Sequence, residues 1–114
     1  RDTSVTGVQT CALPISWLAA SVQRTTVNTE AKLMLLTHAF ETWEVQRVAI
    51  CTDARNERSR NAILRIGAEF EGMLRSHRPS YVAGEEGTLR DTAVFAIIRR
   101  DWPDVKAGLS RRLD

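Results

Sequence analysis

Residues 47–72, RVAICTDARNERSRNAILRIGAEFEG, contain in succession the signals of a strand, a helix and a second strand. The uninterrupted apolar run within Val45–Thr52 is typical of a strand covered on both faces. Small and apolar side chains recur at helical spacing across Asn56–Ile66, and Gly67 then ends this helix as a left-handed cap. Phe70–Leu74 is the second strand. This order indicates an α/β protein.

Upstream of this stretch, the sequence predicts the end of a strand, a loop and a long helix. Trp17–Ala20 is a short apolar run, which we interpret as the end of a strand. Ser21–Asn28 is polar and is expected to form a loop. Thr29–Thr42 is apolar almost all round, which predicts a helix buried on several sides.

Downstream, the sequence predicts a loop, one more strand and a final short helix. Pro79–Leu89 is the loop, and Thr92–Ile98 is a strand rich in valine, phenylalanine and isoleucine. The last helix starts at Asp101, with Pro103 in its first turn, and runs through Leu113. The order β-α-β-α-β-β-α predicts a mixed α/β sheet. Strands separated by a helix should run parallel, and the last two should pair antiparallel.

The first fifteen residues are expected to be foreign to the domain. Residues 5–15, VTGVQTCALPI, resemble the translation of a common short-read sequencing adapter, and all eleven residues match in order. Arg1 and Asp2 fit the sequence upstream in the same library primer. We therefore treat residues 1–15 as an adapter-derived artefact and predict that the native domain occupies residues 16–114.

Composition restricts the chain to one ordinary globular domain. It has 114 residues, 43% of them hydrophobic, and a formal net charge of +2. We expect no membrane partner, because no apolar run approaches the ~20 residues of a spanning helix. We expect no metal site, because His38 and His77 are single. With Cys11 set aside, Cys51 is a lone cysteine, which indicates a small buried apolar residue and a reducing, cytoplasmic compartment.

The stretch Gln23–Ala31 is a candidate anion site, because it joins a strand end to a helix N-terminus. Free backbone N–H groups and the helix dipole attract anions there, and Arg24 could add a charged contact. The alternative is that the loop binds no ligand, because all strand-to-helix loops share these features and most of them bind nothing. The stretch has neither a P-loop nor the Gly-x-Gly-x-x-Gly dinucleotide pattern.

A second candidate site lies at the start of the helix after the central strand. Asn56 could merely cap this helix. Ser59 lies one turn further on, on the apolar face, where a buried hydroxyl needs a hydrogen-bond partner. A ligand could supply that partner, although a backbone carbonyl one turn back is the commoner solution.

Five short motifs occur in order along the chain: Gln23–Lys32, Asn56–Ile63, Arg65–Ala68, Glu71–Gly72 and Arg90–Phe95. Together they resemble the C-terminal half of a GCN5-related N-acetyltransferase (GNAT), in the branch of the Rim-type ribosomal-protein acetyltransferases. The resemblance covers residues 17–113. It implies a truncated GNAT fold whose N-terminal half is missing, so we expect the chain as written to be inactive.

The resemblance also implies a cosubstrate, acetyl-CoA, and roles for individual residues. Backbone amides of the loop would hold the pyrophosphate, and Leu18-Ala19-Ala20 would bond the pantetheine arm and polarise the thioester carbonyl. Asn56 would hydrogen-bond the pantetheine. Ser59 would be the general acid that protonates the leaving thiolate. The implied cofactor-binding residues are Leu18, Ala19, Ala20, Gln23, Arg24, Thr25, Thr26, Val27, Asn28, Thr29 and Asn56.

One residue departs from the motif of this family. Thr26 stands where the first glycine of the pyrophosphate loop is expected, and a β-branched residue disfavours positive φ and crowds a close backbone approach. Asn28, at the second small position, tolerates left-handed geometry better. We therefore expect weakened cofactor affinity.

The expected activity is transfer of acetyl from acetyl-CoA to a primary amine, on a protein N-terminus or a small molecule. Glu41, Glu69 and Glu71 are conceivable bases, but a surface or structural role is the better interpretation of each. The alternative is a non-catalytic module that binds CoA, a protein or RNA. A charge of +2 without interleaved aromatic residues disfavours nucleic acid. The sequence does not indicate the acceptor or the oligomeric state.

Overall fold

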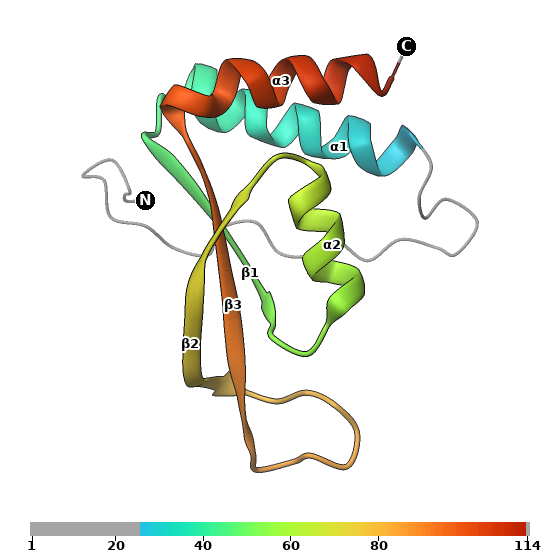
Figure 1. The fold of residues 1–114 in the computed structure, drawn as a ribbon, viewed down its shortest axis with the longest axis vertical. Coiled ribbons are helices and arrows are strands. Elements are labelled where there is room, and N and C mark those ends of the chain that lie inside the picture. Colours follow the sequence, from blue (N-terminus) through green and yellow to red (C-terminus); the bar gives the residue numbers. More distant parts are fainter. Residues whose placement is uncertain (1–25, 114) are drawn as a thin grey trace.

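The computed structural model describes residues 26–113, which form three α-helices packed against a three-stranded sheet (Figure 1). The predicted strand Trp17–Ala20 lies outside the described residues. Helices α1 and α3 lie side by side. The elements in chain order are α1 (Thr26–Thr37), the π-helical turn η3 (His38–Thr42), β1 (Arg47–Asp53), α2 (Glu57–Arg65), β2 (Glu69–Pro79), β3 (Leu89–Ile98), the 3-10 turn η4 (Arg99–Asp101) and α3 (Trp102–Arg111).

Helix α1 differs from its prediction at its start and in its burial. It begins at Thr26, so the prediction that residues 26–28 belong to the preceding loop was wrong. The first turn of a helix tolerates such residues, because its N–H groups need no intrahelical acceptor. The prediction of burial on several sides was also wrong. Leu36 is fully buried, but Met34 and Leu35 are 67% and 46% exposed.

The end of this first helical segment is confirmed at Thr42, but its last turn is π-helical. The backbone N–H of Trp43 donates to the carbonyl of His38 over 3.0 Å, five residues back. A π turn inserts one extra residue relative to an α-helical turn. The insertion lies between Leu36 and Trp43, and Phe40 within it is 1% exposed.

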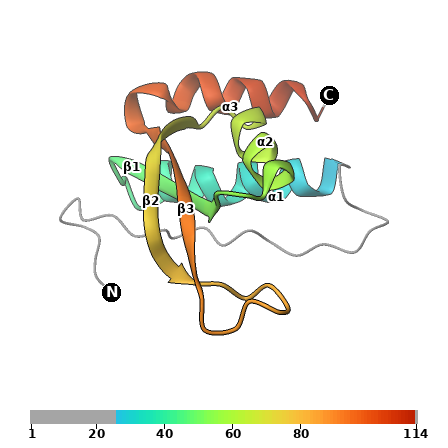
Figure 2. The ribbon, with the colours of Figure 1, turned by 60° about the horizontal axis from the view of Figure 1, so that its bottom comes forward.

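The sheet has the strand order β1-β3-β2, and both pairings are antiparallel. The mixed α/β fold class and the antiparallel pairing of the last two strands are therefore confirmed. Strands β1 and β2, joined through α2, run in the same direction as predicted, but they are not neighbours because β3 lies between them. Strand β2 extends to Pro79, well past its predicted end. The β2–β3 hairpin projects beyond the helices (Figure 2).

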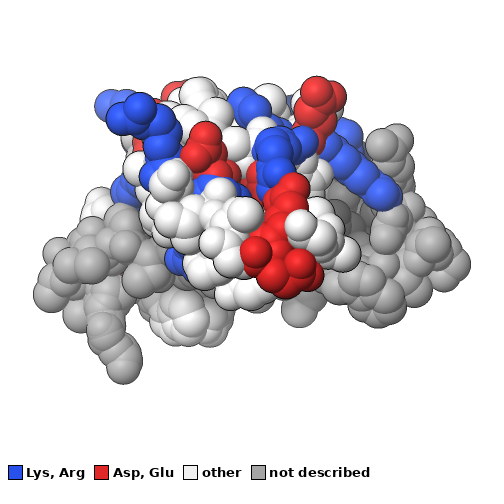
Figure 3. Space-filling model, turned by 90° about the horizontal axis from the view of Figure 1, so that it is seen from below, with Lys and Arg blue, Asp and Glu red and all other residues white. Residues whose placement is uncertain are grey.

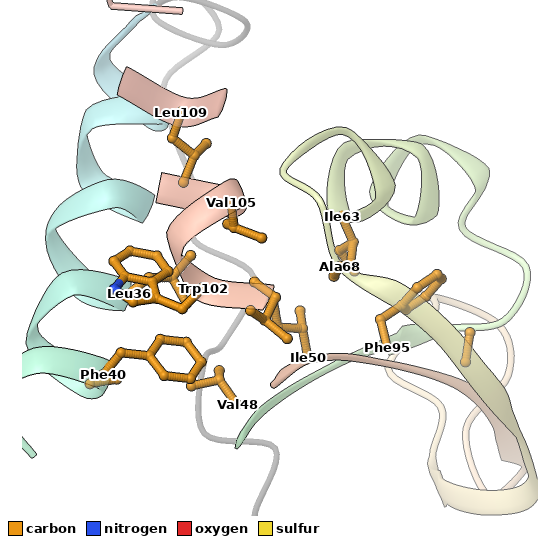
Figure 4. Close-up of a cluster of buried hydrophobic side chains, with 13 residues drawn as sticks. Leu36, Phe40, Val48, Ile50, Ile63, Ala68, Phe95, Trp102, Val105 and Leu109 are labelled. Atoms are coloured by element: carbon orange, nitrogen blue, oxygen red, sulfur yellow. The ribbon is translucent and has the colours of Figure 1, made fainter. Parts of the chain in front are cut away.

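The main core lies between one face of the sheet and the helices (Figure 4). Val48 pairs with Ile97, and Ile50 with Phe95, so alternate residues of β1 and β3 face the same side. Helices α1, α2 and α3 cover these residues. The buried side chains that they contribute are Leu36, Ile63, Trp102, Val105 and Leu109.

The cap at the end of α2 is confirmed at Gly67. Its φ of +104° lies in the left-handed region, which glycine adopts without strain. A Cβ at this position would lie 3.1 Å from Cγ2 of Val105 on α3. The glycine therefore both ends α2 and lets α3 approach closely.

The prediction that Cys51 is a lone apolar cysteine was wrong. Cys51, on β1, is disulfide-bonded. The argument from a lone thiol to a reducing compartment therefore loses its basis.

Two kinds of feature are absent from residues 26–113. No helix in this range has the length and apolar character needed to cross a membrane. No group of three or more histidine, cysteine, aspartate or glutamate side chains in the same range is placed to hold a metal ion.

Candidate active site

The candidate site is built on the turn that joins β1 to α2. Asp53 ends the strand, and its carbonyl accepts a hydrogen bond from the backbone N–H of Asn56 over 2.9 Å. Asn56 caps α2, because its Oδ1 accepts from the backbone N–H of Ser59 over 3.0 Å. The cap engages the oxygen of the Asn56 side-chain amide and not its NH₂ group. A ligand could accept from this group without disturbing the helix.

Ser59 is the residue in this region with an unmet hydrogen-bonding need. Its side chain is 7% exposed, and its Oγ has no hydrogen-bond partner among the described residues. The common local solution, a bond to the carbonyl one turn back, is not adopted. A buried hydroxyl without a partner costs about 1–3 kcal/mol. The site therefore offers one buried donor that a ligand could satisfy.

The side chain of Arg60 holds the same turn by contacts with the turn itself and with strand β2. Its Nη1 donates to the carbonyl of Ala54 over 2.9 Å. The guanidinium also lies over the ring of Phe70, 5.6 Å from its centroid. Arg60 therefore ties the turn before α2 to strand β2.

The start of α1 provides the second part of the candidate site. Thr26, Val27, Asn28 and Thr29 form its first turn, whose backbone N–H groups have no acceptor within the helix. Such amides can bind phosphate groups. The helical conformation of Thr26 also removes the need for positive φ at this position. The other predicted cofactor residues lie outside the described residues: Leu18, Ala19, Ala20, Gln23, Arg24 and Thr25.

Two of the conceivable bases are engaged in contacts within the protein. Glu41 accepts hydrogen bonds from Nζ of Lys106 over 2.7 Å and from Nε1 of Trp102 over 2.9 Å. These bonds, that of Lys106 first, lower the pKa of Glu41. Glu71 forms an ion pair with Arg47 over 2.7 Å. These contacts favour a structural role for both carboxylates.

Sequence reasoning missed an ion-pair cluster beside Asn56. The guanidinium of Arg55 binds Asp53 through Nη2 over 2.9 Å and Glu85 through Nη1 over 2.8 Å. Hydrogen bonds from Arg55 lower the pKa of both carboxyl groups, and the carboxylates raise the pKa of Arg55. The spacing of Asp53 and Arg55 after a strand could have indicated the local ion pair. It gives no indication of the contact between Arg55 and Glu85.

Comparisons with known proteins agree on one family. A family model described as an acetyltransferase (GNAT) domain matches residues 8–69. The "Putative ribosomal N-acetyltransferase YdaF" of Bacillus subtilis is 36% identical over 90 residues, which are 79% of this chain and 46% of that protein. The family match begins within residues 1–15, and the boundary at residue 16 stays a prediction.

Solved structures agree with this family. A "putative acetyltransferase" from T. thermophilus is 39% identical with a TM-score of 0.75, and the match covers 85% of this chain and 50% of that one. Mycobacterium smegmatis RimJ, solved in complex with CoA-disulfide, is 26% identical with a TM-score of 0.67, and the match covers 83% and 44%. The chain therefore spans about half the length of the relatives it matches.

Proposed function

Because the chain belongs to the acetyltransferase (GNAT) family, we propose that it is part of an acetyl-CoA-dependent N-acetyltransferase. The observation that carries the proposal is the buried hydroxyl of Ser59, which has no partner among the described residues and lies one helical turn after Asn56. In this proposal the pantetheine arm accepts from the amide of Asn56, and the sulfur of CoA lies next to Ser59.

The proposed chemistry is direct transfer between two substrates. The amine nitrogen attacks the thioester carbonyl, the C–S bond breaks, and Ser59 donates its hydroxyl proton to the departing thiolate. Ser59 then regains a proton from solvent, and the acetylated amine loses one. Backbone groups of Leu18-Ala19-Ala20 polarise the carbonyl, and the first turn of α1 holds the pyrophosphate.

The proposed acceptor is a primary amine, on a protein N-terminus or on a small molecule. The description of YdaF as a putative ribosomal N-acetyltransferase favours a protein acceptor. We also propose a cytoplasmic location. The family is its only support, because Cys51 is disulfide-bonded and gives no argument for a reducing compartment.

The first test is thermal unfolding of the chain with coenzyme A or with an RNA oligonucleotide. A ligand that binds the native state raises the melting temperature. Our proposal predicts stabilisation by coenzyme A and none by RNA. Stabilisation by RNA alone would instead support a nucleic-acid-binding module.

We further propose that the 114-residue chain alone releases no free thiol from acetyl-CoA, because it spans about half the length of its relatives. A non-catalytic CoA-binding module predicts the same result. A chimera distinguishes the two hypotheses. In it, the part of the Bacillus subtilis relative that has no match in this chain is fused to the chain. Amine-dependent thiol release that Ser59→Ala abolishes supports the acetyltransferase, whereas CoA binding without release supports the non-catalytic module.

A further inference from the structure

The loop that connects β2 to β3 is organised around Glu85. Its backbone N–H donates to the carbonyl of Val82 over 3.0 Å, and its carbonyl accepts from the N–H of Thr88 over 3.0 Å. Its carboxylate accepts from the hydroxyl of Ser80 over 2.7 Å. Because these bonds lie within residues 80–88, any group that holds the Glu85 carboxylate also holds the loop.

Arg55 is that group, and it belongs to the turn before α2. Nη1 and Nη2 of Arg55 donate to the two carboxylate oxygens of Glu85 over 2.8 and 3.0 Å. Nε and Nη2 donate to the two oxygens of Asp53 over 3.1 and 2.9 Å. One planar guanidinium thus binds two carboxylates in paired geometry, which lysine cannot reproduce.

The contact lies on the hairpin side of the molecule, where acidic and basic side chains adjoin (Figure 3). The side chains of Asp53 and Glu85 are 17% and 33% exposed, whereas that of Arg55 is 56% exposed, so solvent screens the two ion pairs in part. The next residue after Arg55 is Asn56, whose Oδ1 holds the N–H of Ser59. Because Arg55 and Asn56 are adjacent in the backbone, a fixed position of Arg55 also restricts the movement of the start of α2.

We propose that Arg55 is a positioning residue that couples the β2–β3 hairpin to the start of α2 and thereby orders Asn56 and Ser59 for coenzyme A. The effect on coenzyme A rests on the proposed function. The coupling of hairpin to helix start does not.

The test measures amide hydrogen exchange and coenzyme A affinity in the 114-residue chain and in its Arg55→Ala, Arg55→Lys and Glu85→Gln variants. The matched control is Arg75→Ala, since Arg75 is exposed on β2 and makes no ion pair with a described residue. Arg55→Ala should accelerate exchange of the Ser59 and Thr88 amides about tenfold and weaken coenzyme A binding about tenfold, and Arg55→Lys should restore part of each. Arg55→Ala combined with Glu85→Gln should add little to either single change.

Two results would overturn the coupling: Ser59 exchange in Arg55→Ala that equals the Arg75→Ala control, or additive effects of the Arg55 and Glu85 changes. Faster exchange with unchanged coenzyme A affinity would overturn the positioning role. If the unsubstituted chain binds no coenzyme A, the proposed function fails, while the exchange data still decide the coupling.

Discussion

Two clusters of side chains, one beside α3 and one at the start of α2, differ in how completely their polar groups are satisfied. Beside α3, the indole of Trp102 stacks on Phe40 with ring centroids 5.1 Å apart, and its Nε1 donates to Glu41. At the start of α2, Ser59 is equally buried but its hydroxyl has no partner among the described residues. The first cluster is complete without a ligand, whereas the second retains a donor that a ligand can use.

The largest effect should come from breaking the complete cluster. Trp102→Ala should lower the free energy of unfolding by about 3–5 kcal/mol, because it removes a large buried ring from the core. Urea denaturation measures this change. Trp43→Ala is the matched control, since Trp43 is 67% exposed, and it should change stability by less than about 0.5 kcal/mol. Equal effects of the two substitutions would contradict the assignment of Trp102 to the core.

Substitutions of Asn56 separate its two roles at the incomplete cluster. Asn56→Ala should lower the free energy of unfolding by about 1 kcal/mol, because the cap of α2 is lost. Asn56→Asp keeps the capping acceptor but removes the NH₂ group, so stability should persist while coenzyme A affinity falls. Urea denaturation and calorimetric titration with coenzyme A measure the two effects. Full affinity in Asn56→Asp would show that the amide does not contact the pantetheine.

Removal of the Ser59 hydroxyl, which has no partner among the described residues, should further distinguish the cluster at the start of α2 from the cluster beside α3. Ser59→Ala should raise the free energy of unfolding by about 1 kcal/mol, because a buried polar group without a partner is eliminated. Binding of coenzyme A should weaken in the same variant. A loss of stability in Ser59→Ala would mean that the hydroxyl already has a partner in the free protein.

The smallest effect concerns pH and the exposed edge of the complete cluster. The bonds from Lys106 and Trp102 hold the pKa of Glu41 below its ordinary value of 4.5. A carboxyl group with a depressed folded-state pKa contributes stability above its unfolded pKa and loses it as pH falls through the folded pKa. The urea concentration at the unfolding midpoint should therefore decrease as the pH is lowered past 4.5. In Glu41→Gln this decrease should be smaller. An unchanged slope in Glu41→Gln would assign the decline to other carboxyl groups.

Local patterns in the sequence were sufficient for most of the fold. The apolar run of β1, the helical spacing of α2 and the glycine at position 67 each predict an element that the structure contains. The exposed side of α1 could not be predicted in this way, because Met34 and Leu35 are as apolar as Leu36. Which side of an apolar helix is covered depends on the elements packed against it.

The candidate site was predictable where its contacts are local in sequence. Asn56 and Ser59 are three residues apart, so capping and burial follow from helix geometry. Arg55 and Glu85 are thirty residues apart, and their contact depends on where the hairpin lies relative to the turn before α2. The disulfide at Cys51 was missed because its residue type and its place in an apolar run do not distinguish a bonded cysteine from a free one.

The π-helical turn at His38–Thr42 holds one residue more than an α-helical turn, so the N–H of Trp43 bonds to a carbonyl five residues back instead of four. Successive residues of an α-helix are rotated by about 100° about its axis. An extra residue in a uniform α-helix would therefore rotate one flank against the other by about that angle, whereas the wide turn absorbs the residue locally. Deletion of one residue within this turn should restore a uniform α-helix in which Leu36 and the amides at Thr26 keep their present directions. The wide turn thus confines an insertion to one turn and leaves the orientation of the rest of the helix unchanged.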